Sequence, residues 1–583
     1  MLNPSTDRLD YGRLLAPPPG FHLEFAAGTT YSLDLDALVG ASLALALGEE
    51  TDSALLENPM CLLEALRGAG DRVALFCEDG QITLPGRASS LYILLEKMVC
   101  PVRVAKGSFH PKFWLLQYQN GQDEKRYRML VLSRNLTFSR SWDVAFSMEG
   151  ARGAPSGEKS KPVQDFLGYL ARQLPDTQAG RAKRRSLNAL IRELPRIVFS
   201  TGERAFCDFD FYPTGIPHHS IRTAPLFTNR FRELLMMSPF LSGSVIRDFN
   251  SRGKRCALFT RAAALAKLKP EDCSSFQLYT LRDSVIDGEA DLSGEESPAQ
   301  HQDLHAKLYL ADRDLYLGSL NATHSAVYHN VEFVLCLRSS GHYLSMDKLL
   351  AALRGNDPGG SGDPFQEAVL SGGMEEPEGD DLDAVIKALV RCSPSACVIP
   401  DGERYALRLR FASLPNSSYA VTLHPLLARG LEASLETEMT FHPLELTQLS
   451  EFYAVSVSGP DQSIHRLLLV TTEGMPEARE AAVVSGVVKE AGLVRYIAFL
   501  LGDDAVVSTL EQSAAGEGGG ALGRQAGLPP LYEKLLLAAA DDRAKLRNVD
   551  SLLNMMEGGE TDQELEQFKT LYSTFKKAVK LDD

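Results

Sequence analysis

The sequence contains no long uninterrupted apolar segment. None of its 583 residues fall in a run of about 20 apolar side chains, the length that a helix needs to span a bilayer. The amino terminus also lacks the basic start and apolar core of a secretory signal peptide. These absences argue against a membrane-spanning or exported protein, and we expect a cytoplasmic chain with no membrane partner.

Paired cysteines and excess positive charge are also lacking. The nine cysteines are scattered, and the one close pair, Cys392 and Cys397, has no second pair or nearby histidines to complete a zinc site. We therefore expect reduced, structural thiols. The net charge of −16 excludes a protein that coats nucleic acid by overall attraction, so a polyanion would have to bind in a local basic cleft.

The composition that remains is that of a folded globular protein. Apolar residues make up 44% of the chain and charged residues 23%, close to the averages of soluble domains. A single core stops growing at about 250–300 residues, so 583 residues predict roughly three or four structural units.

Two parts of the chain have the same order of local signatures. Residues 1–150 alternate short apolar runs with helix-like segments, which is typical of an α/β unit. The first series reads HPK, LSRNLT and WDVAF, and a later series reads HAK, GSLNAT and VEFVL. We interpret this as an internal duplication of about 150–200 residues per copy.

The composition after the duplication changes twice. A stretch rich in glycine, proline and acid predicts a linker, alternating apolar segments after it predict a small β-rich domain, and helical spacing near the end predicts a helical region for core packing or partner docking. The predicted boundaries are 1–190 for the first lobe, 191–350 for the second lobe, 351–383 for the linker, 384–480 for the β-rich domain and 481–583 for the helical domain.

Each copy contains a histidine and a lysine separated by one residue. In an extended strand alternate side chains share a face, so His110 and Lys112 point together, as do His305 and Lys307. Imidazole supplies a nucleophile or a proton, and the ammonium supplies fixed positive charge for a phosphate and its transition state. The two pairs are therefore candidate catalytic half-sites.

A serine and an asparagine follow each pair. Ser133 with Asn135, and Ser319 with Asn321, offer short donors that could hold phosphate oxygens without adding charge. Turn formation and strand capping are the alternative use of such residues.

A carboxylate comes next in each copy, Asp143 in the first and Glu332 in the second. Such a group could bond one ring nitrogen of a histidine, fix its tautomer and raise its basicity.

These residues together resemble the phospholipase D superfamily, whose motif is HxK(x)4D followed by a GSxN segment. His305 to Asp312 match the first element in full, and Gly318 to Asn321 match the second. The first copy departs from the pattern, with Gln117 in place of the aspartate and Leu132 in place of the glycine. Because the family's aspartate is mainly structural, the departure concerns the stability of that half-site. The resemblance covers roughly residues 20–345.

The resemblance implies a fold and a mechanism. The fold is two α/β lobes, each a mixed sheet flanked by helices, packed about a pseudo-twofold axis so that both His–Lys pairs line one cleft. One histidine attacks phosphorus to form a phosphohistidine, and the other protonates the leaving oxygen and then activates water, with no metal or cofactor. By similarity with two-copy members, His110 is the expected nucleophile and His305 the acid and base, although the sequence itself leaves this order open.

A nuclease or nucleic-acid-end phosphodiesterase is the first hypothesis for the substrate, with DNA favoured over RNA. The basic segment 181–196 could contact phosphates, or it could be a solvated helix face. Phe109, Phe113 and Trp114 could stack on bases, although strand alternation favours a core role. The layout also resembles phospholipase-D-like nucleases of bacterial antiviral defence. The basic residues expected to bind nucleic acid are Arg181, Lys183, Arg184 and Arg185.

Two other functions stay open. A phospholipid hydrolase would need a basic, aromatic, amphipathic surface, and the sequence shows none. A subunit that binds phosphodiesters without cutting them would suit the long carboxyl-terminal regions, which could bind protein partners. A homodimer is not needed to complete the site, because one chain carries both half-sites.

Overall fold

The chain forms two compact units in a computed structural model. Unit 1 consists of residues 1–38, 71–84 and 97–381, and unit 2 of residues 39–70, 85–96 and 382–583. The structure describes residues 11–47, 59–138, 141–154, 157–281, 303–339, 343–354, 364–370, 382–460, 462–491 and 543–556, with single residues and one short segment between 497 and 576.

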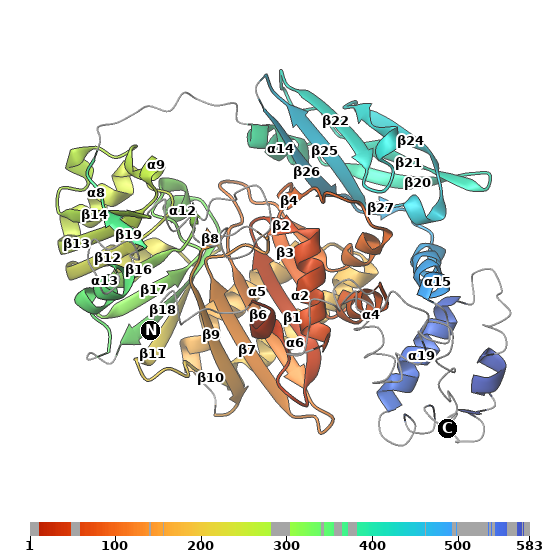
Figure 1. Cartoon of the computed structure of the whole chain (residues 1–583), viewed down its shortest axis with the longest axis horizontal. Helices are drawn as coiled ribbons and strands as arrows, with labels where there is room; N and C mark the ends of the chain where they lie inside the picture. Colours follow the sequence, from red (N-terminus) through yellow and green to blue (C-terminus); the bar gives the residue numbers. More distant parts are fainter. Residues whose placement is uncertain are drawn as a thin grey trace, which may run out of the picture. The chain divides into compact units, whose positions relative to one another are not determined.

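Unit 1 contains two lobes, each built on a mixed sheet (Figure 1). The first lobe has a seven-stranded sheet in the order β10-β9-β7-β6-β1-β3-β5. Strands β1, β3 and β5 run parallel, and β1, β6, β7, β9 and β10 pair antiparallel. The strands are β1 (His22–Thr30), β3 (Val73–Glu78), β5 (Val99–Val102), β6 (Phe113–Gln119), β7 (Lys125–Leu132), β9 (Ala145–Arg152) and β10 (Ile197–Ser200).

The second lobe has an eight-stranded sheet in the order β11-β18-β17-β16-β12-β13-β14-β19. Its centre repeats the first lobe, because β12 pairs parallel with β13 and antiparallel with β16, as β1 does with β3 and β6. The strands are β11 (Phe206–Thr214), β12 (Phe231–Met237), β13 (Gly253–Thr260), β14 (Phe276–Leu281), β16 (Leu308–Ala311), β17 (Asp314–Gly318), β18 (Glu332–Ser339) and β19 (Phe365–Glu367).

One hydroxyl at the carboxyl end of each central strand shows that the repeat extends to individual atoms. Thr30 Oγ1 accepts a hydrogen bond from Leu136 N at 3.0 Å, and Ser238 Oγ accepts one from Ala322 N at 2.9 Å. This correspondence makes each residue of one lobe's site comparable with a residue of the other. The internal duplication read from the sequence therefore has a structural counterpart.

Helices and short elements complete unit 1. In α5, Val163, Phe166 and Leu170 lie at helical spacing on one face and are buried. The Phe113 ring contacts Phe166 and, across the lobes, Phe333, with centroids 5.6 Å and 4.5 Å away. This shared core brings the two half-sites together. The elements are α1 (Tyr11–Leu15), β2 (Leu33–Asp34), α2 (Leu35–Leu47, which continues into unit 2), β4 (Ile82–Thr83), β8 (Ser141–Trp142), α5 (Lys161–Gln173), α6 (Gln178–Glu193), α7 (Pro225–Thr228), α8 (Gly243–Arg252), α9 (Ala262–Leu265), β15 (Asp303–Leu304), α12 (His324–Tyr328) and α13 (Met346–Arg354).

Unit 2 is β-rich and then helical. One sheet has the order β24-β21-β20-β27, and β23, β22, β25 and β26 pair in that order in another. Buried apolar residues of α14 join their common core. The elements are α4 (Pro59–Gly70), α14 (Leu382–Arg391), β20 (Ser395–Asp401), β21 (Arg404–Arg410), β22 (Ala420–Pro425), β23 (Ala433–Ser434), β24 (Glu438–Leu444), β25 (Phe452–Ser458), β26 (Ser463–Leu469), β27 (Thr472–Glu473), α15 (Ala478–Ala491) and α19 (Arg543–Met556).

The fold class predicted from the sequence is confirmed. Mixed sheets flanked by helices form the duplicated part, and a β-rich and then a helical region follow it. Of the predicted linker, residues 355–363 and 371–381 lie outside the described residues, as does most of the predicted helical region after residue 491. No helix in the described part of the chain has the length and apolar character to cross a membrane.

Candidate active site

The backbone N–H group of each candidate histidine donates a hydrogen bond to the other lobe. His110 precedes β6, and its backbone N–H donates to Val331 O at 2.9 Å. His305 follows β15, and its N–H donates to Trp142 O at 2.9 Å. The two contacts are reciprocal, so each lobe positions the histidine of its neighbour.

The histidine side chains are paired across the lobes in the same way. His110 Nδ1 lies 3.0 Å from Glu332 Oε2, and His305 Nδ1 lies 2.9 Å from Asp143 Oδ1. The sequence indicated that these carboxylates could orient histidines but left the pairing open. The structure shows that each carboxylate serves the histidine of the other copy.

Both carboxylates are anionic at neutral pH. Burial alone would raise the pKa of Asp143, but hydrogen bonds from His305 and Ser141 and the charge of Lys307 lower it to about 2. The pKa of Glu332 is also lowered, because contacts with His110, Lys112 and Ser319 outweigh its complete burial. Each histidine therefore faces a fixed negative charge at Nδ1.

The two serines support these carboxylates. Ser133 Oγ donates to Asp143 Oδ1 at 2.7 Å, and Ser319 Oγ donates to Glu332 Oε2. Both serines are fully buried, and their hydroxyls also accept backbone N–H groups at 2.9 and 3.0 Å. The sequence predicted them as phosphate ligands. In the structure their hydroxyls orient the two carboxylates, and phosphate binding by these serines stays a prediction.

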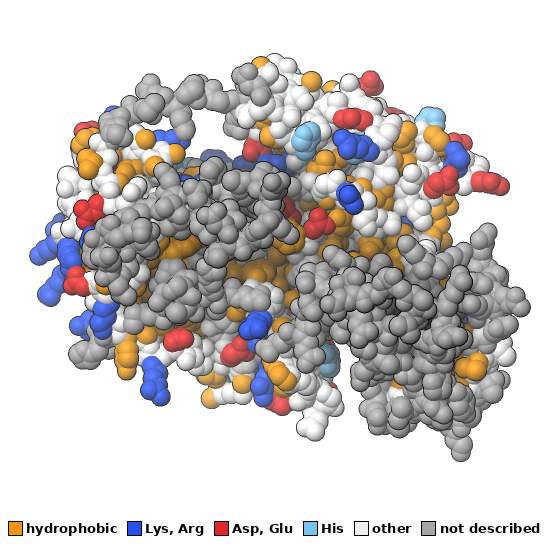
Figure 2. Space-filling model, viewed as in Figure 1, with side chains coloured by type: hydrophobic (Ala, Val, Ile, Leu, Met, Phe, Trp, Pro, Cys, Tyr) orange, Lys and Arg blue, Asp and Glu red, His pale blue; other side chains and the backbone are white. Residues whose placement is uncertain are grey.

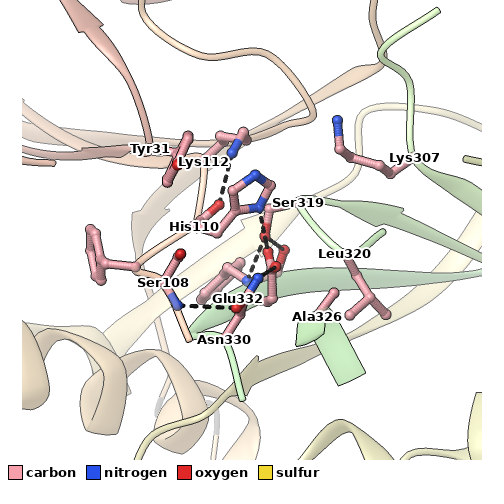
Figure 3. A network of polar contacts seen from close by, with 12 residues as sticks. Tyr31, Ser108, His110, Lys112, Lys307, Ser319, Leu320, Ala326, Asn330 and Glu332 are labelled. Carbon is pink, nitrogen blue, oxygen red and sulfur yellow. Dashed lines mark hydrogen bonds and ion pairs between the residues drawn. The ribbon is translucent and has the colours of Figure 1, made fainter. Parts of the chain in front are cut away.

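Both lysines are buried, and the charge of each lysine acts on the pKa of both histidines. Lys112 Nζ donates to His110 O at 2.9 Å, and Lys307 Nζ donates to His305 O at 2.5 Å. Figure 3 shows both ammonium groups on one side of the His110 ring, with Glu332 on the other. Burial lowers the pKa of Lys112 to about 7, and burial together with the nearby Lys112 charge lowers the pKa of Lys307 well below its usual value.

The imidazoles are neutral at neutral pH. Burial and the charges of Lys112 and Lys307 lower the pKa of both His110 and His305 to about 4, against the opposing effects of Glu332 and Asp143. A carboxylate at Nδ1 places the single proton there and leaves Nε2 as a lone-pair donor. The side chains are 12% and 18% exposed, so both rings can be reached from solvent.

The asparagines differ between the lobes. Asn135 Oδ1 accepts the backbone N–H of Tyr31 at 3.3 Å. Asn321 is 7% exposed, and its Oδ1 has no hydrogen-bond partner in the described part of the chain. The residue after Ser238, in the position of Tyr31, is Pro239, which has no N–H to donate. A single proline thus explains the unpaired oxygen.

Sequence reasoning missed two residues of this site. The Tyr31 ring lies 5.1 Å from the His110 ring, and Lys112 Nζ lies 5.7 Å from the tyrosine centroid. Asn330 donates to Glu332 Oε1 at 3.1 Å and accepts the Ser108 N–H at 3.0 Å. Asn330 lies two residues before Glu332, and this spacing could have indicated that the two side chains interact. Tyr31 has no motif around it that could have indicated its role.

The aromatic residues near the first pair belong to the core. Phe109 and Phe113 are fully buried and Trp114 is 1% exposed. The core role that strand alternation favoured is therefore correct, and these rings are not available to stack on bases.

The predicted basic surface of α6 is largely engaged within the protein. Lys183 is 2% exposed and donates to Val73 O at 2.6 Å, which corrects its prediction as a nucleic-acid ligand. Arg184 donates to Leu174 O at 2.6 Å, and Arg181 pairs with Asp176 at 3.2 Å. Nucleic-acid binding by Arg181, Arg184 and Arg185 stays a prediction. On the face drawn in Figure 2, basic and acidic side chains both occur over the described residues.

The side chain of Asp312, for which the family resemblance implied a structural role, is bonded to backbone groups. Its Oδ1 accepts the backbone N–H groups of Arg232 and Glu233 at 2.8 and 3.0 Å, and its own φ is +54° at the turn after β16. Gln117 needs no such turn, because β6 continues to Gln119. The departure of the first copy therefore follows from a longer strand.

Comparisons with known proteins give structural likeness only. No family model and no curated protein matches the chain. A yeast tyrosyl-DNA phosphodiesterase aligns at 13% identity over 56% of this chain and 84% of its own, with a TM-score of 0.33. The Haemophilus influenzae phosphatidylserine synthase aligns at 11% identity over 65% and 89%, with a TM-score of 0.34. Nuc of Salmonella typhimurium, a phospholipase D family member, aligns at 13% identity over 23% and 83%, with a TM-score of 0.16.

No group of three or more His, Cys, Asp or Glu side chains is placed to hold a metal ion within the described residues. The chemistry available from these residues themselves consists of two neutral imidazoles, two anchored carboxylates and two buried ammonium groups.

Proposed function

We propose that the chain is a phosphodiesterase of the phospholipase D type that cleaves nucleic acid through a phosphohistidine. One observation carries the proposal: each histidine is bound at Nδ1 by a carboxylate from the other lobe, which leaves Nε2 free beside two buried ammonium groups. This arrangement supplies a nucleophile, a proton donor and stabilisation of the oxyanion around one phosphorus atom.

The first step forms a bond from His110 Nε2 to phosphorus and breaks the bond from phosphorus to the leaving oxygen. The negative charge of the bound diester raises the pKa of His305, which then carries a proton and gives it to that oxygen. Lys112 and Lys307 bind the non-bridging oxygens. The products of this step are a free hydroxyl and a phosphohistidine.

The second step reverses the roles. His305, now neutral, takes a proton from water, and the resulting hydroxide attacks phosphorus. The bond from phosphorus to nitrogen breaks, and His110 returns to its neutral state. The carboxylates keep both rings in the required tautomer throughout.

His110 is proposed as the nucleophile because a phosphorylated imidazole is a cation. Glu332 at its Nδ1 is fully buried and is held by Ser319 and Asn330, so it opposes that cation in a low-dielectric setting. Asp143, beside His305, is 12% exposed. The more exposed histidine is better placed to exchange a proton with water.

Nucleic acid, with DNA favoured over RNA, is the proposed substrate class, and a bacterial antiviral nuclease is the proposed setting by resemblance of the layout. The alternative of a subunit that binds without cutting is less well supported, since both complete histidine, lysine and carboxylate sets are present and aligned.

Trapping the intermediate tests this proposal. The purified chain is incubated with bis(p-nitrophenyl) phosphate and with labelled single- and double-stranded DNA and RNA, with and without EDTA, then quenched and digested for mapping of phosphohistidine. We expect cleavage in EDTA and label on His110, accumulating when His305→Asn slows the second step.

The matched control is His219→Asn. His219 Nε2 lies 3.0 Å from Asp165 Oδ2, so the variant removes a histidine–carboxylate pair of similar geometry outside the site, and activity should persist. If no phosphodiester is cleaved, or if His305→Asn behaves like His219→Asn, the proposal is wrong.

A further inference from the structure

The two lobes carry opposite charges at one pair of equivalent positions beside the histidines. Thr30 pairs with Cys77 in the first sheet, and Met237 pairs with Phe259 in the second. Since Ser238 corresponds to Thr30, the residue after Cys77 corresponds to the residue after Thr260. These residues are Glu78 and Arg261.

Both residues form a hydrogen bond with the backbone of the residue just before a candidate catalytic histidine. Glu78 accepts that hydrogen bond, whereas Arg261 donates it. Glu78 Oε2 accepts the N–H of Phe109 at 2.6 Å. Arg261 Nε donates to the carbonyl of Leu304 at 2.8 Å. The backbone before the histidine is thus anchored in each lobe, but only the second lobe gains a cation, which is bonded to the residue before His305.

An exposed aromatic ring accompanies this cation. Phe240 is 46% exposed, and its ring centroid lies 4.7 Å from Arg261 Cζ. Its backbone is fixed by a hydrogen bond from Ser238 Oγ to Phe240 O at 2.8 Å. Ser32 occupies the equivalent position in the first lobe. A half-exposed phenyl ring held rigidly beside a guanidinium contributes little to a core, and it suits a planar, anionic ligand.

We propose that Phe240 and Arg261 form a platform that binds one unpaired nucleotide of the substrate on the His305 side of the scissile phosphate. The base stacks on Phe240, and Arg261 contacts the neighbouring phosphate. This rests on the proposed function and deepens it, because a base that stacks on a side chain must be unpaired. The substrate class is therefore single-stranded or frayed nucleic acid. Since His305 protonates the leaving oxygen, the platform holds the leaving nucleotide.

Binding affinity tests the platform independently of turnover. The full chain carrying His110→Asn is titrated against a fluorescent single-stranded DNA 12-mer and against the same backbone with abasic sites. Phe240→Ala should weaken binding to the first by about 5- to 50-fold and leave the second unchanged, in line with the usual contribution of base stacking. Phe240→Trp should retain wild-type affinity, and Phe240→Ala should keep the slope of affinity against salt.

The matched control is Phe21→Ala. The Phe21 centroid also lies 4.7 Å from an arginine, Arg126, but that residue pairs with Tyr118 at the opposite end of β6 and β7 from Lys112. The control should bind both oligonucleotides normally. Equal losses in both variants, or equal affinity of the unsubstituted platform for normal and abasic strands, would overturn the inference.

The two proposals fail separately. If the chain hydrolyses bis(p-nitrophenyl) phosphate but binds no oligonucleotide, the platform is wrong and the phosphodiesterase chemistry stands. If binding depends on Phe240 but no diester is cleaved by the wild-type chain, the platform stands and the catalytic proposal is wrong.

Discussion

The two half-sites of unit 1 share their supporting hydrogen bonds and differ in the groups placed around them. In each lobe a serine orients the carboxylate, the carboxylate orients the opposite histidine, and the lysine donates to that lobe's own histidine carbonyl. The differences include Tyr31 against Pro239, Ser32 against Phe240 and Glu78 against Arg261. The comparison separates shared groups, to which we assign the proposed chemistry, from unshared groups, which we propose decide which side of a substrate each lobe holds.

Substitution of the two carboxylates should give the largest difference in kcat between the half-sites. We expect Glu332→Gln to lower kcat about 10³-fold and Asp143→Asn about 10²-fold, because an amide stabilises neither the tautomer nor the imidazolium, and Glu332 faces the proposed phosphohistidine. Initial rates with bis(p-nitrophenyl) phosphate measure both. Asp165→Asn, which alters the separate pair with His219, is the control. Equal losses at the two positions would remove the basis for a nucleophile in the first half-site.

The lysines should be nearly equivalent. Lys112→Met and Lys307→Met are each expected to lower kcat about 10²-fold, because each removes one fixed charge from the developing oxyanion. Buried Lys183 provides a control, since Lys183→Met should reduce stability rather than kcat in the folded fraction, as measured by thermal unfolding alongside activity. A loss of activity at only one of the two catalytic lysines would show that a single lobe holds the phosphate.

The pH profile should have limbs that belong to different groups. Both imidazoles have a pKa of about 4 in the free chain, so kcat/KM should fall below that pH as the His110 nucleophile is protonated, and above it as His305 loses the proton that it gives to the leaving oxygen, by about tenfold per unit on each side. The fall should steepen above about 7, where Lys112 loses its charge. Lys112→Arg should shift this steepening to higher pH. Because the histidine pKa is lower in the folded chain, the stability contributed by these neutral rings should be lost as pH falls from the ordinary value of 6.5 towards 4.

Substitution of Asn321 should mainly lower activity, and substitution of Asn135 should mainly lower stability. Asn321→Ala is expected to lower kcat/KM about tenfold, since an unpaired buried amide oxygen is available to a ligand group such as a hydroxyl. Asn135→Ala should leave kcat/KM close to wild type and reduce the free energy of unfolding by about 1 kcal/mol, because Tyr31 N–H loses its partner. Steady-state kinetics and urea unfolding distinguish them, and a reversed pattern would contradict the comparison.

The smallest effect on chemistry is expected at Asp312. Asp312→Ala should reduce the free energy of unfolding by about 1–3 kcal/mol through two lost hydrogen bonds and a strained positive φ, with kcat unchanged. Asp312→Gly removes the strain and should be milder. Gln117→Ala, at the matching position of the first lobe, should show no such difference between alanine and glycine, because its strand is extended there.

The sequence predicted what depends on local spacing. The paired His–x–Lys motifs and the segments around Asn135 and Asn321 indicated the duplication and the fold, because alternation and motif order are written along single strands. The structural role of Asp312 also followed from the family resemblance.

What the sequence could not predict depends on packing between distant strands. The crossing of Asp143 and Glu332 to opposite histidines follows from contacts such as Phe109 with Val331, which no spacing reveals. The burial of Lys183 was equally unpredictable, because a basic helix is expected to face solvent until the sheet on which it packs is known. Ser133 and Ser319 are of a residue type that can bind phosphate. Only their hydrogen bonds in the folded chain show that they orient Asp143 and Glu332.

The crossed pairing also determines when, during synthesis of the chain, each histidine meets its carboxylate. His110 and its carboxylate partner are separated by 222 positions, so a growing polypeptide carries an unassisted imidazole until nearly the whole of unit 1 has left the ribosome. Under the proposed function, the nascent chain would thus stay inert during translation, and its activity would appear only when the second lobe has folded against the first.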